Sequence, residues 1–227
     1  MEDKNNNVPP APKKGNGNDE RIRARLGKIK LALDNAILPD VQAVIAKNGY
    51  DNAEIKVGMN MHDDAYKKHE LQKKEYGEQF EATDEFNIAK ELANKEYKKH
   101  LNIARVVFRN NRKVIETLML DGLRQKNYDG WYEQLRVFYK NALDSVDIIT
   151  ILTKKGVGKT DLENGWNLTE NASTAHAKQS NETSEAVNAT KQRDKALDIL
   201  EEWFSDFSGI CHAEMEDYPE LIKKLGL

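Results

Sequence analysis

A segment rich in lysine and glycine, residues 153–160, carries the residue types that bind phosphate. It reads Thr-Lys-Lys-Gly-Val-Gly-Lys-Thr and follows an apolar run. A phosphate-binding loop needs Gly, four residues and then Gly-Lys-Ser/Thr so that backbone amides wrap the phosphates, but the first position here is Thr153. Only 67 residues follow Thr160, too few for the rest of a nucleotide-binding sheet. The pattern therefore predicts a turn between two helices.

The five histidines lack the spacings of common metal sites. None has Glu three residues before it, as in di-iron bundles, and no His-x-x-x-His run is present. His69 and His176 remain candidates because they occupy matching positions in two related halves of the chain. If two long helices packed antiparallel at this level, their imidazoles would approach and bind a metal with Glu75 or Glu182 nearby. The alternative is hydrogen bonding of both rings to water or neighbouring hydroxyls, and we predict no metal or cofactor.

Cys211 is the only cysteine, and it lies on an apolar stripe with Phe204, Phe207 and Met215. This setting predicts a buried small hydrophobic side chain and not an activated thiolate. A single cysteine excludes an internal disulfide and a cysteine zinc cage. No Gly-x-Ser-x-Gly nucleophile motif is present either. The sequence thus predicts no catalytic residue, and we expect a protein that is not an enzyme.

The composition bears on location and partners. Formal net charge is −3, so no strong positive field is available to bind nucleic acid. The N-terminus lacks the apolar core of a signal peptide, and no apolar run approaches the roughly 20 residues of a membrane span. We expect a cytoplasmic protein with no nucleic-acid partner and no membrane span.

The chain contains two related halves. When the sequence is shifted along itself by 107 residues, residues 34–120 lie over 141–227 without a gap, and 17 of those 87 positions are identical. A fixed offset of this kind indicates duplication of one structural unit. The identical pairs include Asp40/Asp147, Gly49/Gly156, Gly58/Gly165, His69/His176, Gln72/Gln179 and Glu75/Glu182.

Apolar spacing predicts helices throughout. Residues 19–36 place apolar side chains every three or four positions, and Pro39 suits the first turn of a second helix that Gly49 ends. The long stretches at about 53–109 and 160–216 contain no proline, and each is either one helix or two. No segment alternates with period two, so no sheet is expected.

The predicted fold class is all-α, with two tandem pseudo-symmetric helical-bundle units built on long amphipathic helices. Residues 1–18 hold nothing to bury and form a flexible tail. Residues 19–120 form the first unit and residues 121–227 the second.

A heptad pattern runs along both long stretches, with 4,3 spacing from Ile55 to Thr83 and from Leu162 to Thr190. The middle of this seam is polar in both copies. Polar seam positions fix the register of a partner helix through hydrogen bonds at some cost in stability. We therefore predict an interaction surface there. Its residues are His69, Gln72, Tyr76, His176, Gln179 and Thr183.

Two segments carry a resemblance to other proteins. They begin Ile103-Ala-Arg-Val-Val-Phe-Arg and Ile210-Cys-His-Ala-Glu-Met-Glu, and the second runs on to a terminal Leu-Gly-Leu. Over most of residues 20–227 the chain resembles a set of uncharacterised bacterial helical proteins with duplicated halves. The resemblance implies the helical fold and a bacterial origin, and transfers no site residue because the set has no assigned activity. His212 replaces the Arg of the first copy.

These observations predict a non-enzymatic structural or protein-interaction helical module, whose partner is a protein, further copies of this chain included. The alternative is a helical bundle that binds a small ligand or a metal at a site between the two units.

Overall fold

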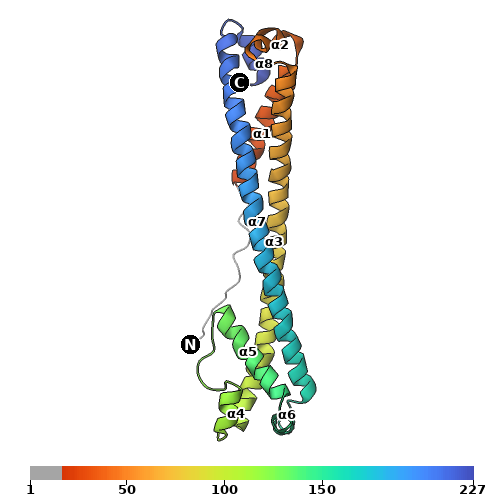
Figure 1. Cartoon of the computed structure of the whole chain (residues 1–227), viewed down its shortest axis with the longest axis vertical. Helices are drawn as coiled ribbons and strands as arrows, with labels where there is room; N and C mark the ends of the chain where they lie inside the picture. Colours follow the sequence, from red (N-terminus) through yellow and green to blue (C-terminus); the bar gives the residue numbers. More distant parts are fainter. Residues whose placement is uncertain (1–16) are drawn as a thin grey trace. The chain divides into compact units, whose positions relative to one another are not determined.

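The computed structural model describes residues 17–227, and 85% of them are helical with no strand among them, which confirms the all-α class (Figure 1). The predicted tail lies outside the described residues except for Gly17 and Asn18, which begin the first helix. The elements are α1 (Gly17–Ala36), α2 (Pro39–Ile45), the 3-10 turn η1 (Ala46–Asn48), α3 (Asn52–Val107), α4 (Arg112–Thr117), α5 (Tyr128–Leu143), α6 (Val146–Thr153), α7 (Lys159–Glu214) and α8 (Pro219–Leu225).

Each long stretch is a single continuous helix. Helices α3 and α7 have 56 residues each, and their bounds differ by the same 107 positions that relate the sequence halves. Isolated glycines such as Gly77 cost a helix only about 1 kcal/mol relative to Ala, whereas no proline interrupts either segment. No helix among the described residues has the length and apolar character needed to cross a bilayer.

Residue chemistry at the ends of the short helices explains their bounds. Pro39 occupies the first turn of α2, where its missing N–H costs no hydrogen bond. Ser145 caps α6 by accepting a hydrogen bond from the backbone N–H of Ile148. Gly156 has φ +81° in the connection from α6 to α7, a conformation that favours glycine. The prediction that residues 153–160 form a helix-to-helix turn is therefore confirmed.

The chain forms two compact units, which we call unit 1 (residues 17–72 with 189–227) and unit 2 (residues 73–188). This division differs from the sequence halves 19–120 and 121–227. The reason is that α3 and α7 are unbroken, so each half contributes one part of its long helix to each unit.

In unit 1 the first part of α3 and the last part of α7 lie side by side and antiparallel. Trp203 Nε1 donates a hydrogen bond to Glu54 at 2.7 Å, and Arg193 donates to the side chain of Gln72 at 3.1 Å. Helix α8 packs on α1, and its Lys224 pairs with Asp40 of α2 at 2.7 Å. The core includes Leu26, Ile29, Leu33, Ile45, Ile55, Leu200, Phe204, Phe207 and Leu225.

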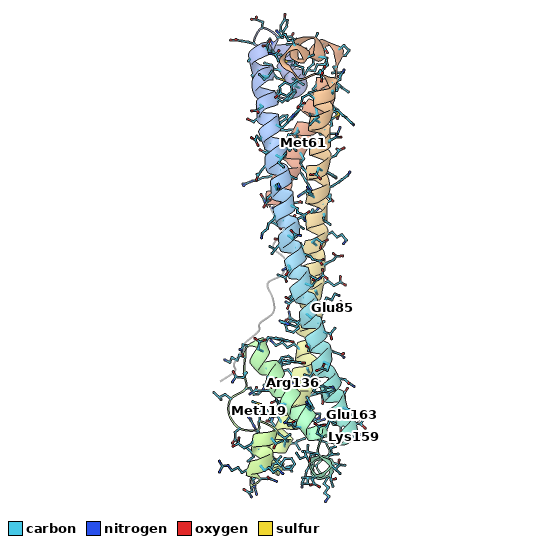
Figure 2. All side chains as sticks on the ribbon, in the orientation of Figure 1. Met61, Glu85, Met119, Arg136, Lys159 and Glu163 are labelled. Carbon is cyan, nitrogen blue, oxygen red and sulfur yellow. The ribbon has the colours of Figure 1, made fainter. Side chains whose placement is uncertain are left out.

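Unit 2 contains the last part of α3 and the first part of α7 together with α4, α5 and α6. Lys178 of α7 pairs with Glu85 of α3 at 2.7 Å. Glu85 is labelled in Figure 2. Helix α5 packs against both α4 and α6, and the side chain of Asn141 donates to the backbone carbonyl of Thr117 at 2.7 Å. The core includes Tyr97, Leu101, Phe108, Leu118, Trp131, Leu135, Phe138, Tyr139, Leu152 and Leu162.

Candidate functional site

The buried face of α3 follows a register that differs in part from the predicted seam. Ile55, His62 and His69 are buried as expected. Between them the structure buries small residues, including Ala65, while Tyr66 is 49% exposed. Burial therefore agrees with the predicted seam at Ile55, His62 and His69, but it falls one position earlier than predicted at Ala65, and the seam residue Tyr76 is exposed. Small side chains at the intermediate positions let the neighbouring helices approach closely, which a tyrosine there would prevent.

His69 links α3 to the start of α1 in unit 1. The imidazole is 1% exposed, and its Nε2 lies 2.9 Å from Oδ1 of Asp19. Asp19 stands in the first turn of α1, where a carboxylate is also favoured by the helix dipole, and its other oxygen lies 3.3 Å from Arg23. His69 therefore holds the first turn of α1 against the long helix.

His176 makes an aromatic contact in unit 2. Its ring stacks on Tyr128 with centroids 3.5 Å apart and planes inclined by 14°, and Phe86 lies 5.0 Å away. Tyr128 is the first residue of α5. Both histidines thus contact the beginning of the helix that opens their sequence half, through a close approach to the carboxylate of Asp19 in one unit and a ring stack in the other. Each has its partners within its own unit, and a joint metal role for the two stays a prediction.

Two more predicted residues join α3 to α7 by hydrogen bonds. Gln72 accepts from Arg193 in unit 1, and Gln179 donates to the hydroxyl of Thr83 at 3.4 Å in unit 2. Thr183 is exposed and donates its hydroxyl proton to the backbone carbonyl of Gln179. Part of the polar seam is therefore internal to each unit, and part faces solvent.

An aromatic pair lies open on α3 in unit 2. Tyr76 is 36% exposed and Phe80 is 59% exposed, and their rings meet edge to face with centroids 6.3 Å apart. Farther along the same helix, Ile88 and Leu92 are 61% and 49% exposed. Both pairs have i,i+4 spacing, which places each pair together on the helix surface. Tyr76 was predicted as an interaction residue, but Ile88 and Leu92 were not. Their exposure depends on which face of α3 packs against the neighbouring helices, and the sequence alone does not determine that face.

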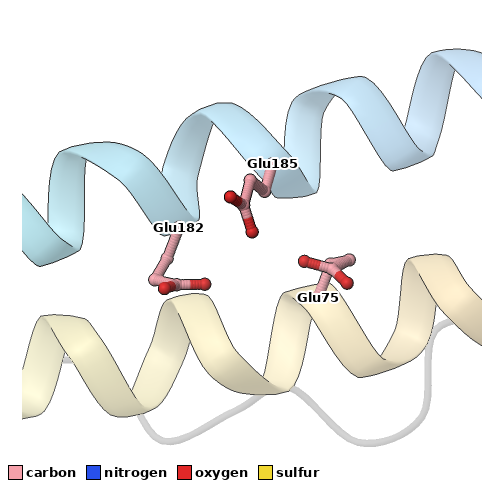
Figure 3. Close-up of side chains that lie close together, drawn as sticks. All are labelled: Glu75, Glu182 and Glu185. Atoms are coloured by element: carbon pink, nitrogen blue, oxygen red, sulfur yellow. The ribbon is translucent and has the colours of Figure 1, made fainter.

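Three carboxylates meet between α3 and α7 in unit 2. One side-chain oxygen from each of Glu75, Glu182 and Glu185 lies within 4.8 Å of the others (Figure 3). Oε2 of Glu75 is buried without a hydrogen-bond partner, although Lys74 approaches the other oxygen at 3.7 Å. Carboxylate oxygens are the ligands that hard cations such as Ca²⁺ and Mg²⁺ prefer. The sequence named Glu75 and Glu182 as candidate ligands beside histidine; the structure groups them with Glu185.

A buried polar pair in unit 2 was missed at the sequence level. His100 is 1% exposed, and its Nδ1 lies 3.2 Å from the hydroxyl of Tyr139. Burial lowers the pKa of His100, and burial also raises the pKa of Tyr139. Both side chains belong to the interior of unit 2, where the ring of Tyr139 also packs against Phe138.

Cys211 is completely buried in unit 1, and burial raises the pKa of its thiol to about 12. A thiol with this pKa stays protonated at neutral pH and is a poor nucleophile. The prediction of a buried small hydrophobic side chain is therefore confirmed.

The hollows of the described surface are shallow. In unit 2, a groove of about 860 Å³ runs between the end of α3 and α6. A second hollow of about 460 Å³ adjoins it at Ile151. In unit 1, a hollow of about 320 Å³ lies beside Arg25 and His212. Neither Cys211 nor His100 lines any of these three hollows.

No family model, curated protein or solved structure matches this chain. The fold is that of an all-α, bundle-like protein.

Proposed function

We propose that this chain is a non-enzymatic helical module that acts by contacting other protein chains, further copies of itself included. The observation that carries the proposal is the exposed aromatic pair Tyr76 and Phe80 on α3. Aromatic side chains contribute large contact areas and are enriched among the residues that dominate binding energy at protein interfaces.

The arrangement of exposed apolar residues supports helix-on-helix contact. Tyr76, Phe80, Ile88 and Leu92 fall on one row of α3 with steps of four residues, interrupted by Asp84. Rows of this kind form ridges that pack into the groove of another helix. A partner helix that packed on either pair would remove two large side chains from water, because each step of four residues turns about 40° around the helix and the two pairs face different directions. Of the other predicted interaction residues, Thr183 is exposed on α7 and is available to a partner in this proposal, whereas His69, Gln72, His176 and Gln179 make their contacts within their own units.

We also propose that the chain arose by tandem duplication of one helical unit and that α3 and α7 form an antiparallel coiled coil. The shared offset of 107 residues in the bounds of these helices supports the duplication. Matching residues along the two helices are buried, among them Ala65 with Ala172 and Ala82 with Ala189. A bacterial origin and a cytoplasmic location belong to the same proposal.

The test replaces the aromatic pair by the double substitution Tyr76→Ser and Phe80→Ser. We expect the variant to lose mass in light scattering of the purified protein, or to lose a partner that the wild type retains in a pull-down. Tyr66→Ser is the matched control, because Tyr66 is a similarly exposed tyrosine on α3 that stacks on His62 within unit 1. Equal mass and equal retention for wild type and double variant would contradict the proposal.

A second candidate function is cation binding between the sequence halves. The observation that favours it is the group of Glu75 from α3 with Glu182 and Glu185 from α7. Titration of the metal-free protein with Ca²⁺ or Mn²⁺ in a calorimeter tests it, with Glu182→Gln as the variant and Glu78→Gln as a control outside the group. Heat of binding that Glu182→Gln removes and Glu78→Gln retains supports a cation site; no binding heat in the wild type rejects it.

A further inference from the structure

The corresponding ends of the two long helices carry opposite charges. Residues 109–113, which follow α3, read Arg-Asn-Asn-Arg-Lys. Residues 216–220, which stand 107 positions later and follow α7, read Glu-Asp-Tyr-Pro-Glu. All ten residues are exposed, and no ion pair among the described residues engages a side chain of either segment. We call these the basic segment and the acidic segment.

The basic segment adjoins the groove between the end of α3 and α6 in unit 2. The groove of about 860 Å³ has apolar walls from Ile103, Val106, Val107 and Ile151. Its charged lining consists of Arg109 and Lys155, with no carboxylate. Val106 is 71% exposed and Ile151 is 39% exposed, so the groove presents bare apolar surface to water. An occupant that fits it has an apolar or aromatic group beside negative charges.

The acidic segment has that chemistry. Tyr218 is 49% exposed and stands between Asp217 and Pro219. The backbone is already ordered, because the N–H of Tyr218 donates to the carbonyl of Met215 at 2.8 Å and Pro219 begins α8. A segment that is fixed before binding loses little conformational entropy on docking. Tyrosine is also among the residues most enriched at interface centres.

We propose that the acidic segment of one copy docks in the groove of unit 2 of a second copy, with Tyr218 against Val106 and Ile151 and with Glu216 and Asp217 facing Arg109 and Lys155. This inference rests on the proposed function and names its partner and its surface. The two docking surfaces are different, so each copy offers one of each. Contacts of this head-to-tail kind do not stop at a dimer unless a ring closes.

The test is sedimentation velocity of the full chain over a wide range of concentrations. The wild type associates beyond a dimer, and high salt weakens the association because the opposed charges are exposed to solvent. The groove variant Arg109→Glu/Lys155→Glu and the segment variant Glu216→Lys/Asp217→Lys each weaken self-association at least about tenfold, because like charges then face each other. The groove variant keeps an intact acidic segment, and the segment variant keeps an intact groove. When the two variants are mixed, these two surfaces bind each other and complexes form again. Lys98→Glu/Lys99→Glu is the control for a change of net charge.

Three outcomes overturn the inference: a wild type that stays monomeric, association that neither charge variant alters, and variants that fail to recover when mixed. The wild type could instead stay monomeric and sediment with anionic lipid vesicles, while Arg109→Glu/Lys155→Glu does not. That result would mean that the groove binds a membrane surface and not a second copy. The proposed function is tested separately by Tyr76→Ser/Phe80→Ser. If this variant loses partner contact while the charge variants have no effect, the proposed function is retained and only the docking of the acidic segment is rejected.

Discussion

The ring of Tyr139 on α5 lies against Gly165 on α7, so close that a Cβ atom at Gly165 would stand 2.2 Å from the ring carbons. Gly58, at the matching position of α3, meets the ring of Trp203 in the same manner, at 2.4 Å. Both glycines lie inside long helices, where glycine is ordinarily unfavourable. Their role is to leave room for an aromatic ring that packs across the helix.

We therefore expect Gly165→Ala to destabilise the protein. Tyr139 is completely buried, so its ring cannot move aside without disturbing the core, and overpacking of this kind costs roughly 1–3 kcal/mol. Gly77→Ala is the matched control, because a Cβ there meets nothing within 4 Å and Ala raises helix stability by roughly 0.5–1 kcal/mol. Urea unfolding monitored by circular dichroism measures both. Equal effects of the two substitutions would contradict the close packing at Gly165.

His100 should make stability depend on pH. Burial lowers its pKa in the folded protein below the value of 6.5 that applies to the unfolded chain. At pH values between the folded-state and unfolded-state pKa of His100, the unfolded protein binds more protons than the folded protein. The free energy of unfolding is therefore highest above about pH 6.5 and decreases as the pH falls through the folded-state pKa of His100. His100→Gln keeps a hydrogen-bonding side chain beside Tyr139 but does not titrate. We expect a flatter profile of unfolding free energy between neutral and mildly acidic pH for this variant, and an unchanged slope would exclude His100 as the source.

Cys211 should react with thiol reagents only after unfolding. Its side chain is completely buried and burial raises its pKa to about 12, so the folded protein offers almost no accessible thiolate at neutral pH. A colorimetric disulfide reagent should therefore label the native protein many times more slowly than the protein in denaturant. Rapid labelling under native conditions would show that unit 1 opens around Cys211.

The stack of His176 on Tyr128 should anchor the start of α5. Aromatic contacts of this kind contribute about 0.5–1.5 kcal/mol beyond the area that they bury. His176→Ala should accordingly increase hydrogen exchange in the first turn of α5, while His176→Phe, which keeps a ring, should retain most of the protection. Unchanged exchange in His176→Ala would mean that Trp131 and the rest of the core hold the helix without the stack.

Local sequence patterns determined much of this protein. Apolar periodicity, Pro39 and the glycine positions predicted the helices to within a few residues, and the turn at Gly156 followed from the alignment of this residue with Gly49. The burial of Cys211 followed from its apolar stripe. These features depend on residues within one or two helical turns of each other, so spacing and intrinsic conformational preference suffice to predict them.

Tertiary structure alone decided which segments pack together. The joining of residues 17–72 with 189–227 in one compact unit depends on contacts between residues far apart in the sequence, such as Lys224 with Asp40. The shift of the buried face of α3 toward Ala65, and away from Tyr66, has the same cause, since apolar spacings of three and four are both available on that helix. A helix pattern fixes which residues share a face, but only the neighbouring helices determine which face is buried, because that choice minimises exposed apolar surface over the whole unit.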